Sequence, residues 1–183
     1  MAESALPTST TLITIVPGGY KPEQGQSTQA SQVTTLPAPP LDGIRVTLKQ
    51  YIEPETADVD ISREPLLISV GRGIQTQDNI AIAEELASAL GATVCASRPV
   101  VDQGWLPISR LVGKSGNVVK PKIYLTMGIS GAPEHVEAIM SSETIIAINT
   151  DVNAPIFNIA KYGTVCDLFD LIPVLTEKIL AAK

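Results

Sequence analysis

The first residues that could do chemistry are two glycines flanking an arginine, at positions 71–73, directly after the apolar run 66–70. Glycines let a backbone approach an anion closely, and the Arg72 guanidinium can bind phosphate through two parallel hydrogen bonds. The turn matches a dinucleotide fingerprint at two glycines, but Thr76 occupies the third position and no acidic residue lies about 20 positions onward. The pattern disfavours an NAD-type site and leaves two interpretations, an anion-binding turn or a tight turn with a solvated arginine.

A second glycine-containing loop, residues 128–133, leads into an expected helix. Its glycines and its early proline leave backbone N–H groups free to face a pyrophosphate. The only histidine, His135, follows in the first turn of that helix and so lies beside this candidate anion site. A single histidine usually has a structural role or lies on the protein surface, so its position alone leaves both a binding and a structural role open.

Polar residues also follow the other expected strands: Ser97 and Arg98 follow one, Asn149 follows another and Asp167 follows the last. Parallel strands of an α/β sheet end at the same edge, so these groups are expected to converge on one ligand. The segment 113–115 resembles part of a phosphate-binding P-loop, but Ile108 stands where that motif requires glycine. A P-loop is therefore excluded.

The residues for most other chemistry are missing. The sequence contains no nucleophile elbow with a Ser-His-Asp set, no His and Cys cluster for a metal and no obvious pair of acids. Its two cysteines, Cys95 and Cys166, form no disulfide framework and are expected to be small buried residues in a reducing compartment. Any chemistry is therefore expected to belong to a bound cofactor.

These residues need a scaffold that brings strand ends together, and the pattern from residue 66 onward predicts one. Short apolar runs, expected to be strands buried on both faces, alternate with amphipathic stretches, expected to be helices. The strands are residues 66–70, 93–95, 122–126, 144–148 and 164–166; the helices are 78–90, 133–140 and 170–182. This alternation predicts an α/β fold, a Rossmann-like parallel sheet with helices on both faces.

Residues 1–65 differ in composition, because they hold eight of the 14 prolines in little more than a third of the chain. Their middle, 17–40, favours turns and extended linker. Two β-rich segments, 11–16 and 44–49, predict strands that pair with each other, with the main domain or with another chain. We expect an N-terminal extension over 1–65 and a ligand-binding domain over 66–183.

Composition excludes several classes of partner. The chain has 44% hydrophobic and 17% charged residues and a formal net charge of -6, which is typical of a folded globular protein. An acidic balance gives no broad attraction to nucleic acid or to anionic lipid. No apolar run approaches the roughly 20 residues that span a bilayer. Nucleic acid and a membrane span are therefore not expected.

Six motifs in order resemble one family, the FAD-binding domain of electron-transfer-flavoprotein alpha subunits. They lie at residues 69–73, 96–102, 112–116, 128–135, 148–157 and 162–169. Three positions depart from the family pattern: Val70 replaces a glycine, and Lys114 and Ser115 replace Gln and Thr. The family's large N-terminal domain is represented only by residues that resemble its last strand and an interdomain segment.

This resemblance implies FAD as the cofactor and an electron carrier rather than an enzyme that transforms a substrate. Arg98 and His135 would lie near the flavin ring and stabilise its negative charge on reduction. Ser130 and the amides after it would suit the pyrophosphate, and Asn149 and Asp167 the adenosine. The implied contacts are Arg72, Ser97, Arg98, Val112, Gly113, Lys114, Ser115, Ser130, Gly131, Ala132, Pro133, Glu134, His135, Asn149, Asp167 and Leu168.

The resemblance also implies partners, namely a beta subunit and a donor dehydrogenase, and a prokaryotic cytoplasmic location rather than the mitochondrial matrix. An isolated chain is expected to bind FAD weakly or to form a homo-oligomer through its early strands. The alternative interpretation is a redox-inert nucleotide-binding domain that supports an assembly, since a fold does not determine function.

Overall fold

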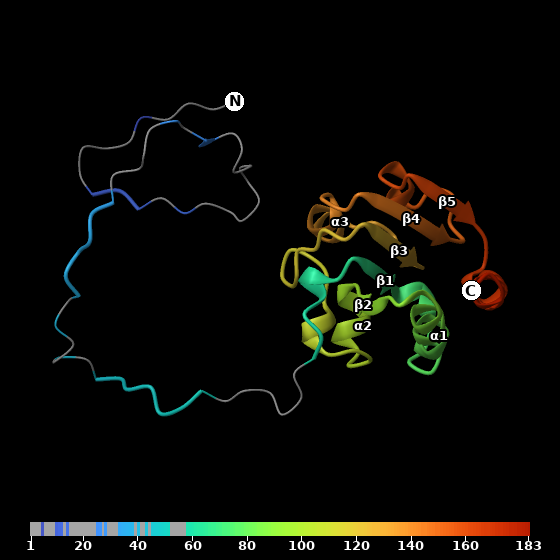
Figure 1. Ribbon diagram of the computed structural model, residues 1–183, viewed down its shortest axis with the longest axis horizontal. Coiled ribbons are helices and arrows are strands. Elements are labelled where there is room, and N and C mark those ends of the chain that lie inside the picture. Colours follow the sequence, from blue (N-terminus) through green and yellow to red (C-terminus); the bar gives the residue numbers. More distant parts are fainter. Residues whose placement is uncertain are drawn as a thin grey trace. The chain divides into compact units, whose positions relative to one another are not determined.

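The computed structural model describes residues 5, 10–12, 14, 25–26, 28, 33–38, 40, 43, 45–51 and 58–183. The chain divides into two units, Met1–Ile52 and Glu53–Lys183. The helices and strands that could position a site belong to the second unit (Figure 1).

The second unit is built on a five-stranded parallel sheet with the order β2-β1-β3-β4-β5. Its central strands consist largely of Ile, Leu and Val, which suit a sheet covered on both faces. The strands are β1 (Leu66–Val70), β2 (Thr93–Ala96), β3 (Ile123–Met127), β4 (Thr144–Asn149) and β5 (Tyr162–Val165). The predicted Rossmann-like α/β fold is confirmed.

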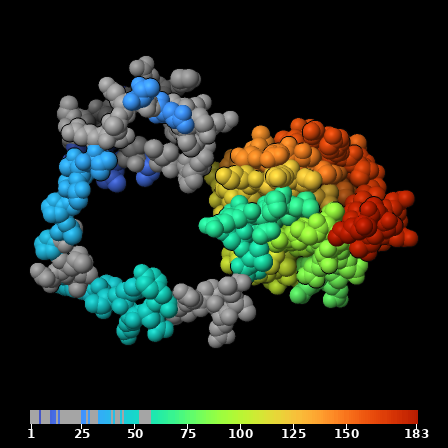
Figure 2. All heavy atoms as spheres, viewed as in Figure 1, coloured from blue at the N-terminus to red at the C-terminus, as the bar shows by residue number. Residues whose placement is uncertain are grey.

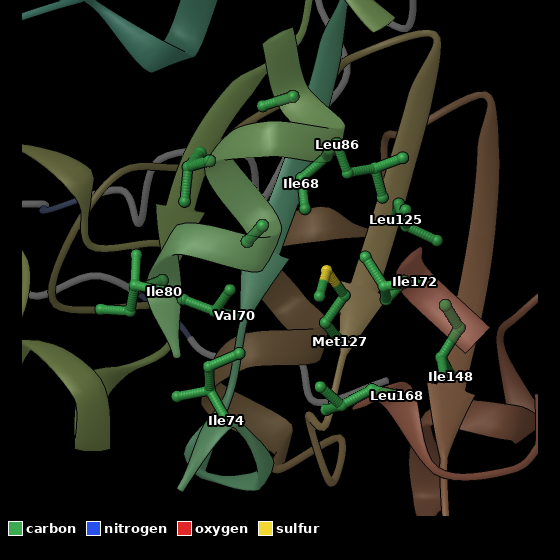
Figure 3. Packing of buried hydrophobic residues seen from close by; sticks show 14 of the residues in the cluster. Ile68, Val70, Ile74, Ile80, Leu86, Leu125, Met127, Ile148, Leu168 and Ile172 are labelled. Atoms are coloured by element: carbon green, nitrogen blue, oxygen red, sulfur yellow. The ribbon is translucent and has the colours of Figure 1, made fainter. Parts of the chain in front are cut away.

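One face of the sheet is covered by α1 (Ile80–Leu90) and α4 (Leu168–Ala181), which lie side by side (Figures 1 and 2). Leu86 of α1 and Ile172 of α4 are fully buried against Ile68 and Leu125 of the sheet (Figure 3). These apolar side chains recur at helical spacing, so each helix buries one stripe. Their burial anchors the helices and thereby the loops that precede them.

The other face is covered by α3 (Pro133–Ile139), whose Ala138 and Ile139 pack against Leu67 and Tyr124 of the sheet. A short helix, α2 (Arg98–Asp102), follows β2 and was not predicted, because five residues containing a proline carry no helical periodicity. Short 3-10 turns complete the connections: η2 (Ile61–Arg63), η3 (Arg72–Ile74), η4 (Ile108–Arg110) and η5 (Pro155–Asn158). The three predicted helices are confirmed, with ends shifted by one or two residues.

The prediction that every strand is buried on both faces is wrong for β5. All four of its residues are exposed, including Tyr162 at 58% and Val165 at 52%. The strand lies at one edge of the sheet and pairs with β4 alone among the described strands (Figure 1). Edge position is not a sufficient reason for the exposure, because β2 lies at the other edge and is largely buried; the side chains of β5 are exposed because its faces are left uncovered. Sequence composition alone does not reveal which faces are covered.

The early strands are not borne out where the structure describes them. Residues 45–51 form no strand and are exposed, with Val46 at 80% and Leu48 at 68%. A strand needs a partner for its backbone hydrogen bonds, and no pairing involves these residues in the described part of the chain. Half of the other segment, 11–16, lies outside the described residues, and Thr11, Leu12 and Thr14 are not in a strand.

The segment before β1 packs onto the domain. Arg110 holds the Asp58 carboxylate through Nε, 2.8 Å from Oδ1, and donates a further hydrogen bond of 2.8 Å to the Val94 carbonyl. The guanidinium holds the pKa of Asp58 well below its usual range, and Ile61 is buried nearby at 1% exposure. Residues 58–65 therefore belong to the folded unit that contains the sheet.

Candidate functional site

An open pocket of about 790 Å³ lies at the carboxyl ends of the strands. Its walls come from the loops after β1, β2 and β3, from the end of β4 and from the loop 111–115. This is the edge at which ligands bind in open α/β sheets. Of the predicted contacts, the pocket is lined by Arg72, Ser97, Arg98, Val112, Gly113, Lys114, Ser115, Ser130, Ala132, Glu134, His135 and Asn149.

Two glycines, Gly73 and Gly128, form the floor shared by this pocket and a smaller one beside it. The Gly73 amide donates a hydrogen bond of 3.1 Å to the Gly128 carbonyl. A Cβ on Gly73 would lie 2.7 Å from the Gly128 Cα, closer than any side chain tolerates. The amide of Gly71 is likewise bonded, to Met127, so these glycines serve loop-to-loop packing and their amides are not free for an anion. The interpretation of residues 71–73 as an anion-binding turn therefore rests on Arg72 alone.

The loop before α3 keeps its amides free. The backbone N–H groups of Ser130, Gly131 and Ala132 donate no hydrogen bond within the described residues, while the Ser130 carbonyl accepts from Ile156. Gly131 has a φ of +90°, and a Cβ there would lie 2.3 Å from the Ile156 nitrogen. Glycine is thus required at this position, and the loop it shapes leaves three consecutive amides without a protein acceptor, which makes them candidate donors for an anionic group.

Arg98 is held from two sides across the pocket. Its Nε lies 3.0 Å from Oδ1 of Asp102, one helical turn later in α2, and its Nη1 donates to Ser115 Oγ at 2.8 Å. All three side chains line the pocket. The guanidinium therefore spans from α2 to the loop 111–115, as a fixed cation in an exposed wall.

His135 is buried between β3 and the same loop. Its Nδ1 lies 3.1 Å from the Val112 carbonyl oxygen and its Nε2 lies 3.0 Å from the Tyr124 hydroxyl. A carbonyl can only accept, so Nδ1 carries the proton and donates it to Val112. Burial lowers the pKa of His135 to about 4, which leaves Nε2 unprotonated and accepting from Tyr124 near neutral pH.

This neutral state limits one expectation. Without a ligand His135 is neutral at pH 7, so stabilisation of a reduced flavin by its positive charge would require the flavin's negative charge to raise the pKa of His135. Its present bonds instead fasten the loop 111–115 to α3, together with the Lys114 amide, which donates 2.9 Å to the Glu134 carbonyl.

The cations of the pocket are Arg72, Arg98 and Lys114, and its acids are Asp102 and Glu134. Lys114 Nζ lies 3.5 Å from Glu137, but both side chains are more than 60% exposed, so solvent screens that pair. With three cations and two acids, the walls carry one net positive charge, which suits a ligand that contains an anionic group.

Asn149 ties two loops together. Its Nδ2 donates 2.8 Å to the Ile129 carbonyl, and its Oδ1 accepts 2.9 Å from the Asp151 amide. The side chain thus positions the loop after β3 and still lines both pockets. It has one N–H left for a ligand.

A second pocket of about 160 Å³ adjoins the first at Asn149, Gly73 and Gly128. The predicted contacts Asp167 and Leu168 line it, and Asp167 also caps α4 by accepting 2.8 Å from the Phe169 amide. Gln75 forms part of its rim with a φ of +70°, in a tight turn in which the Thr76 amide donates to the Ile74 carbonyl. The structure therefore divides the predicted contacts between two adjacent spaces.

Two predicted contacts, Gly131 and Pro133, line neither pocket, although they lie in the loop and the first turn of α3 that do. Several lining residues were not predicted. The sequence did hold a signal for Asp102, because it is an acid four positions after Arg98. That spacing brings the two side chains together only in a helix, and no helix was expected there. Five further residues of the large pocket were not among the implied FAD contacts: Gly73, Pro99, Leu111, Gly128 and Ile129. Of these, Gly73, Gly128 and Ile129 lie in the two glycine-containing loops that the sequence indicated as candidate anion sites.

Other kinds of site are not found in the described part of the chain. No group of three or more His, Cys, Asp or Glu side chains could hold a metal ion. None of the helices in the same residues is long and apolar enough to cross a bilayer.

The sheet, the pocket at its carboxyl edge and the free loop amides define a nucleotide-binding domain of the Rossmann-like class. Comparison with known proteins names the family. Residues 60–140 match the model of the electron transfer flavoprotein FAD-binding domain. This confirms the predicted resemblance and, at the level of the family, FAD as the cofactor.

Curated relatives agree. The chain is 43% identical over 175 residues to an electron transfer flavoprotein subunit alpha of Methylophilus methylotrophus, covering 94% of this chain and 54% of the relative. It is 39% identical over 178 residues to the corresponding subunit of Mycobacterium leprae, covering 95% and 54%. It is also 39% identical over 178 residues to Protein FixB of Escherichia coli, covering 96% and 56%. The chain spans about half the length of the curated relatives it matches.

Proposed function

We propose that this chain binds FAD across the two adjacent pockets and carries electrons between dehydrogenases and an acceptor, together with a beta subunit. The observation that carries the proposal is the pocket at the carboxyl edge of the sheet, lined by three cations and by Ser130 and Ala132, whose amides donate no hydrogen bond within the described residues. It lies in a domain that matches an FAD-binding family. When bound, FAD would supply the redox chemistry.

The residues present suit the parts of this cofactor. The unpaired amides of Ser130 and Ala132, with the cation of Arg72 on the same pocket, suit a pyrophosphate. Asn149 and Asp167 lie towards the smaller pocket and offer an N–H and carboxylate oxygens, which suit the hydroxyls and ring edges of adenosine. Arg98 supplies the cation for the remaining wall of the larger pocket, which we assign to the flavin ring.

The state of His135 fits a role in holding the cofactor site together. His135 is neutral near pH 7 and both ring nitrogens are engaged, so it holds the loop 111–115 rather than moving a proton. The side chains bind and orient the cofactor, and the charges of Arg98 and Lys114 favour its reduced, more negative state.

Two further parts of the proposal are supported only by the relatives. Two of them carry the name "subunit alpha", which supports assembly with a second kind of subunit. All three are bacterial, which supports a location in a prokaryotic cytoplasm.

The test is an equilibrium titration of the purified full chain with FAD, followed by quenching of flavin fluorescence. Arg98→Ala is expected to weaken binding roughly tenfold or more, because it removes hydrogen bonds from a charged donor. Arg63→Ala, which removes an exposed arginine outside both pockets, is the matched control and should leave the Kd unchanged. Absence of FAD uptake would overturn the proposal.

Two further arms separate electron transfer from a redox-inert site. ADP and NAD are titrated in parallel, and FAD is expected to bind more tightly than either. The midpoint potential of bound FAD is then compared with that of free FAD. Equal potentials with equally tight ADP binding would favour the redox-inert alternative.

A further inference from the structure

We propose that Asp102 is a positioning residue of the FAD site, which orients Arg98 and sets how much of its positive charge the cofactor experiences. This inference rests on the proposed function. It starts from the only two side chains that hold Arg98 in the described part of the chain, Asp102 and Ser115.

Asp102 and Arg98 are the last and first residues of α2, one helical turn apart. The Arg98 Nε lies 3.0 Å and 3.3 Å from the two carboxylate oxygens, so its single N–H is shared by both. On the opposite wall, Ser115 accepts from Nη1 at 2.8 Å. Holding one group at both ends fixes the plane of the guanidinium across the pocket.

This arrangement leaves donors for a ligand. An arginine has five N–H groups, and Asp102 and Ser115 use one each. The three that remain, on Nη1 and Nη2, make no hydrogen bond within the described residues. Because Asp102 takes the Nε end, the free donors are gathered at the far end of the guanidinium, where the side chain meets the loop 111–115.

The same carboxylate also offsets the cation. Asp102 lines the pocket itself, so a ligand there experiences a pair of opposite charges rather than an isolated arginine. Reduction makes a flavin more negative, so an uncompensated Arg98 would favour the reduced form more strongly. Both side chains are more than half exposed, at 60% and 56%, so solvent screens the effect and it is modest.

Orientation and charge can be separated by substitution. Asp102→Asn keeps an oxygen that accepts from Nε but removes the negative charge, whereas Asp102→Ala removes both. Glu85→Gln, on the exposed face of α1 and outside both pockets, removes one negative charge elsewhere and is the matched control.

The experiment measures the Kd of oxidised FAD and the midpoint potential of bound FAD for the full chain and the three variants. The difference between this potential and that of free FAD gives the Kd ratio of oxidised to reduced FAD. Asp102→Asn is expected to raise the midpoint potential and to change the Kd ratio about two- to fivefold in favour of reduced FAD, without raising the Kd of oxidised FAD. Asp102→Ala is expected to raise the Kd of oxidised FAD several-fold as well, because Arg98 loses its orientation.

The outcomes distinguish the two proposals. If the unaltered chain binds FAD but Asp102→Asn changes the Kd ratio no more than Glu85→Gln does, this inference is overturned and the proposed function stands. If Asp102→Ala lowers thermal stability but changes neither the Kd nor the potential, Asp102 only stabilises α2, and this inference is overturned. If the unaltered chain takes up no FAD, both proposals are overturned.

Discussion

His135 and Val112, 23 residues apart in the chain, are joined by a hydrogen bond of 3.1 Å from the imidazole Nδ1 to the backbone carbonyl oxygen. The bond links α3 to the loop 111–115, so two walls of the candidate FAD site are joined directly. The Tyr124 hydroxyl completes the link by donating to Nε2 from inside the sheet. The site is therefore held from its buried side, whereas its exposed side is held by Arg98.

The burial of His135 predicts a specific pH dependence of stability. Its folded pKa, about 4, lies below the unfolded value near 6.5, so the unfolded chain takes up the proton first as pH falls. Stability is full above about pH 6.5 and decreases towards pH 4. Urea unfolding is expected to give a free energy about 2 kcal/mol lower at pH 5 than at pH 8. His135→Gln, the control for the only histidine, should remove most of this difference; an unchanged slope would mean that other groups cause it.

The contact between Gly73 and Gly128 predicts that a single methyl group disturbs the floor of both pockets. Gly73→Ala would place a Cβ 2.7 Å from the Gly128 Cα, so the two loops must separate. We expect a loss of roughly 2 kcal/mol in the free energy of unfolding, together with weaker FAD binding. Gly104→Ala, which has open space around the Cβ but a φ of +74°, is the comparison and should cost about 1 kcal/mol without affecting FAD. Equal FAD affinity in the two variants would argue against a shared floor.

The backbone of Gln75 predicts a stabilising substitution at the rim of the smaller pocket. Its φ of +70° and ψ of −51° are strained for a residue with a side chain. Gln75→Gly is expected to raise the melting temperature, with a gain of about 1 kcal/mol after the greater entropy of the unfolded glycine is included. The same change at Gln103, where φ is −81°, should instead destabilise the domain. A loss of stability at both positions would show that the strain at Gln75 is negligible.

The Asp58–Arg110 pair predicts that the segment before β1 contributes to domain stability. Both side chains are less than a quarter exposed, and Arg110 also binds the Val94 carbonyl. Arg110→Ala is expected to cost roughly 2 to 3 kcal/mol in chemical unfolding, because it leaves the partly buried Asp58 carboxylate without its cation. Arg63→Ala breaks an exposed ion pair with Asp60 and should cost under about 1 kcal/mol. Similar losses for the two arginines would contradict the anchoring role of Arg110.

Several features could be predicted from the sequence alone. The apolar runs, their alternation with helical stretches and the polar residues after them predicted a parallel α/β sheet with a ligand at its carboxyl edge. These signals are local, because periodicity and turn chemistry are properties of a few neighbouring residues. For the same reason the loop 128–133 and the residues Arg98, Asn149 and Asp167 could be identified as candidate contacts from their types and their positions after the expected strands.

Tertiary structure alone decided how these residues are used. It placed β5 at an exposed edge, left 45–51 without a strand, and formed α2, which brings Asp102 to Arg98. It also showed that Gly71 and Gly73 serve loop packing and that His135 is buried and neutral. These properties depend on which segments meet in space, and burial and pairing between distant residues leave no periodic trace in the chain. The sequence thus indicated most of the residues that gather at the site, and packing determined which of them bear charge, which have free donors and which only hold the others in place.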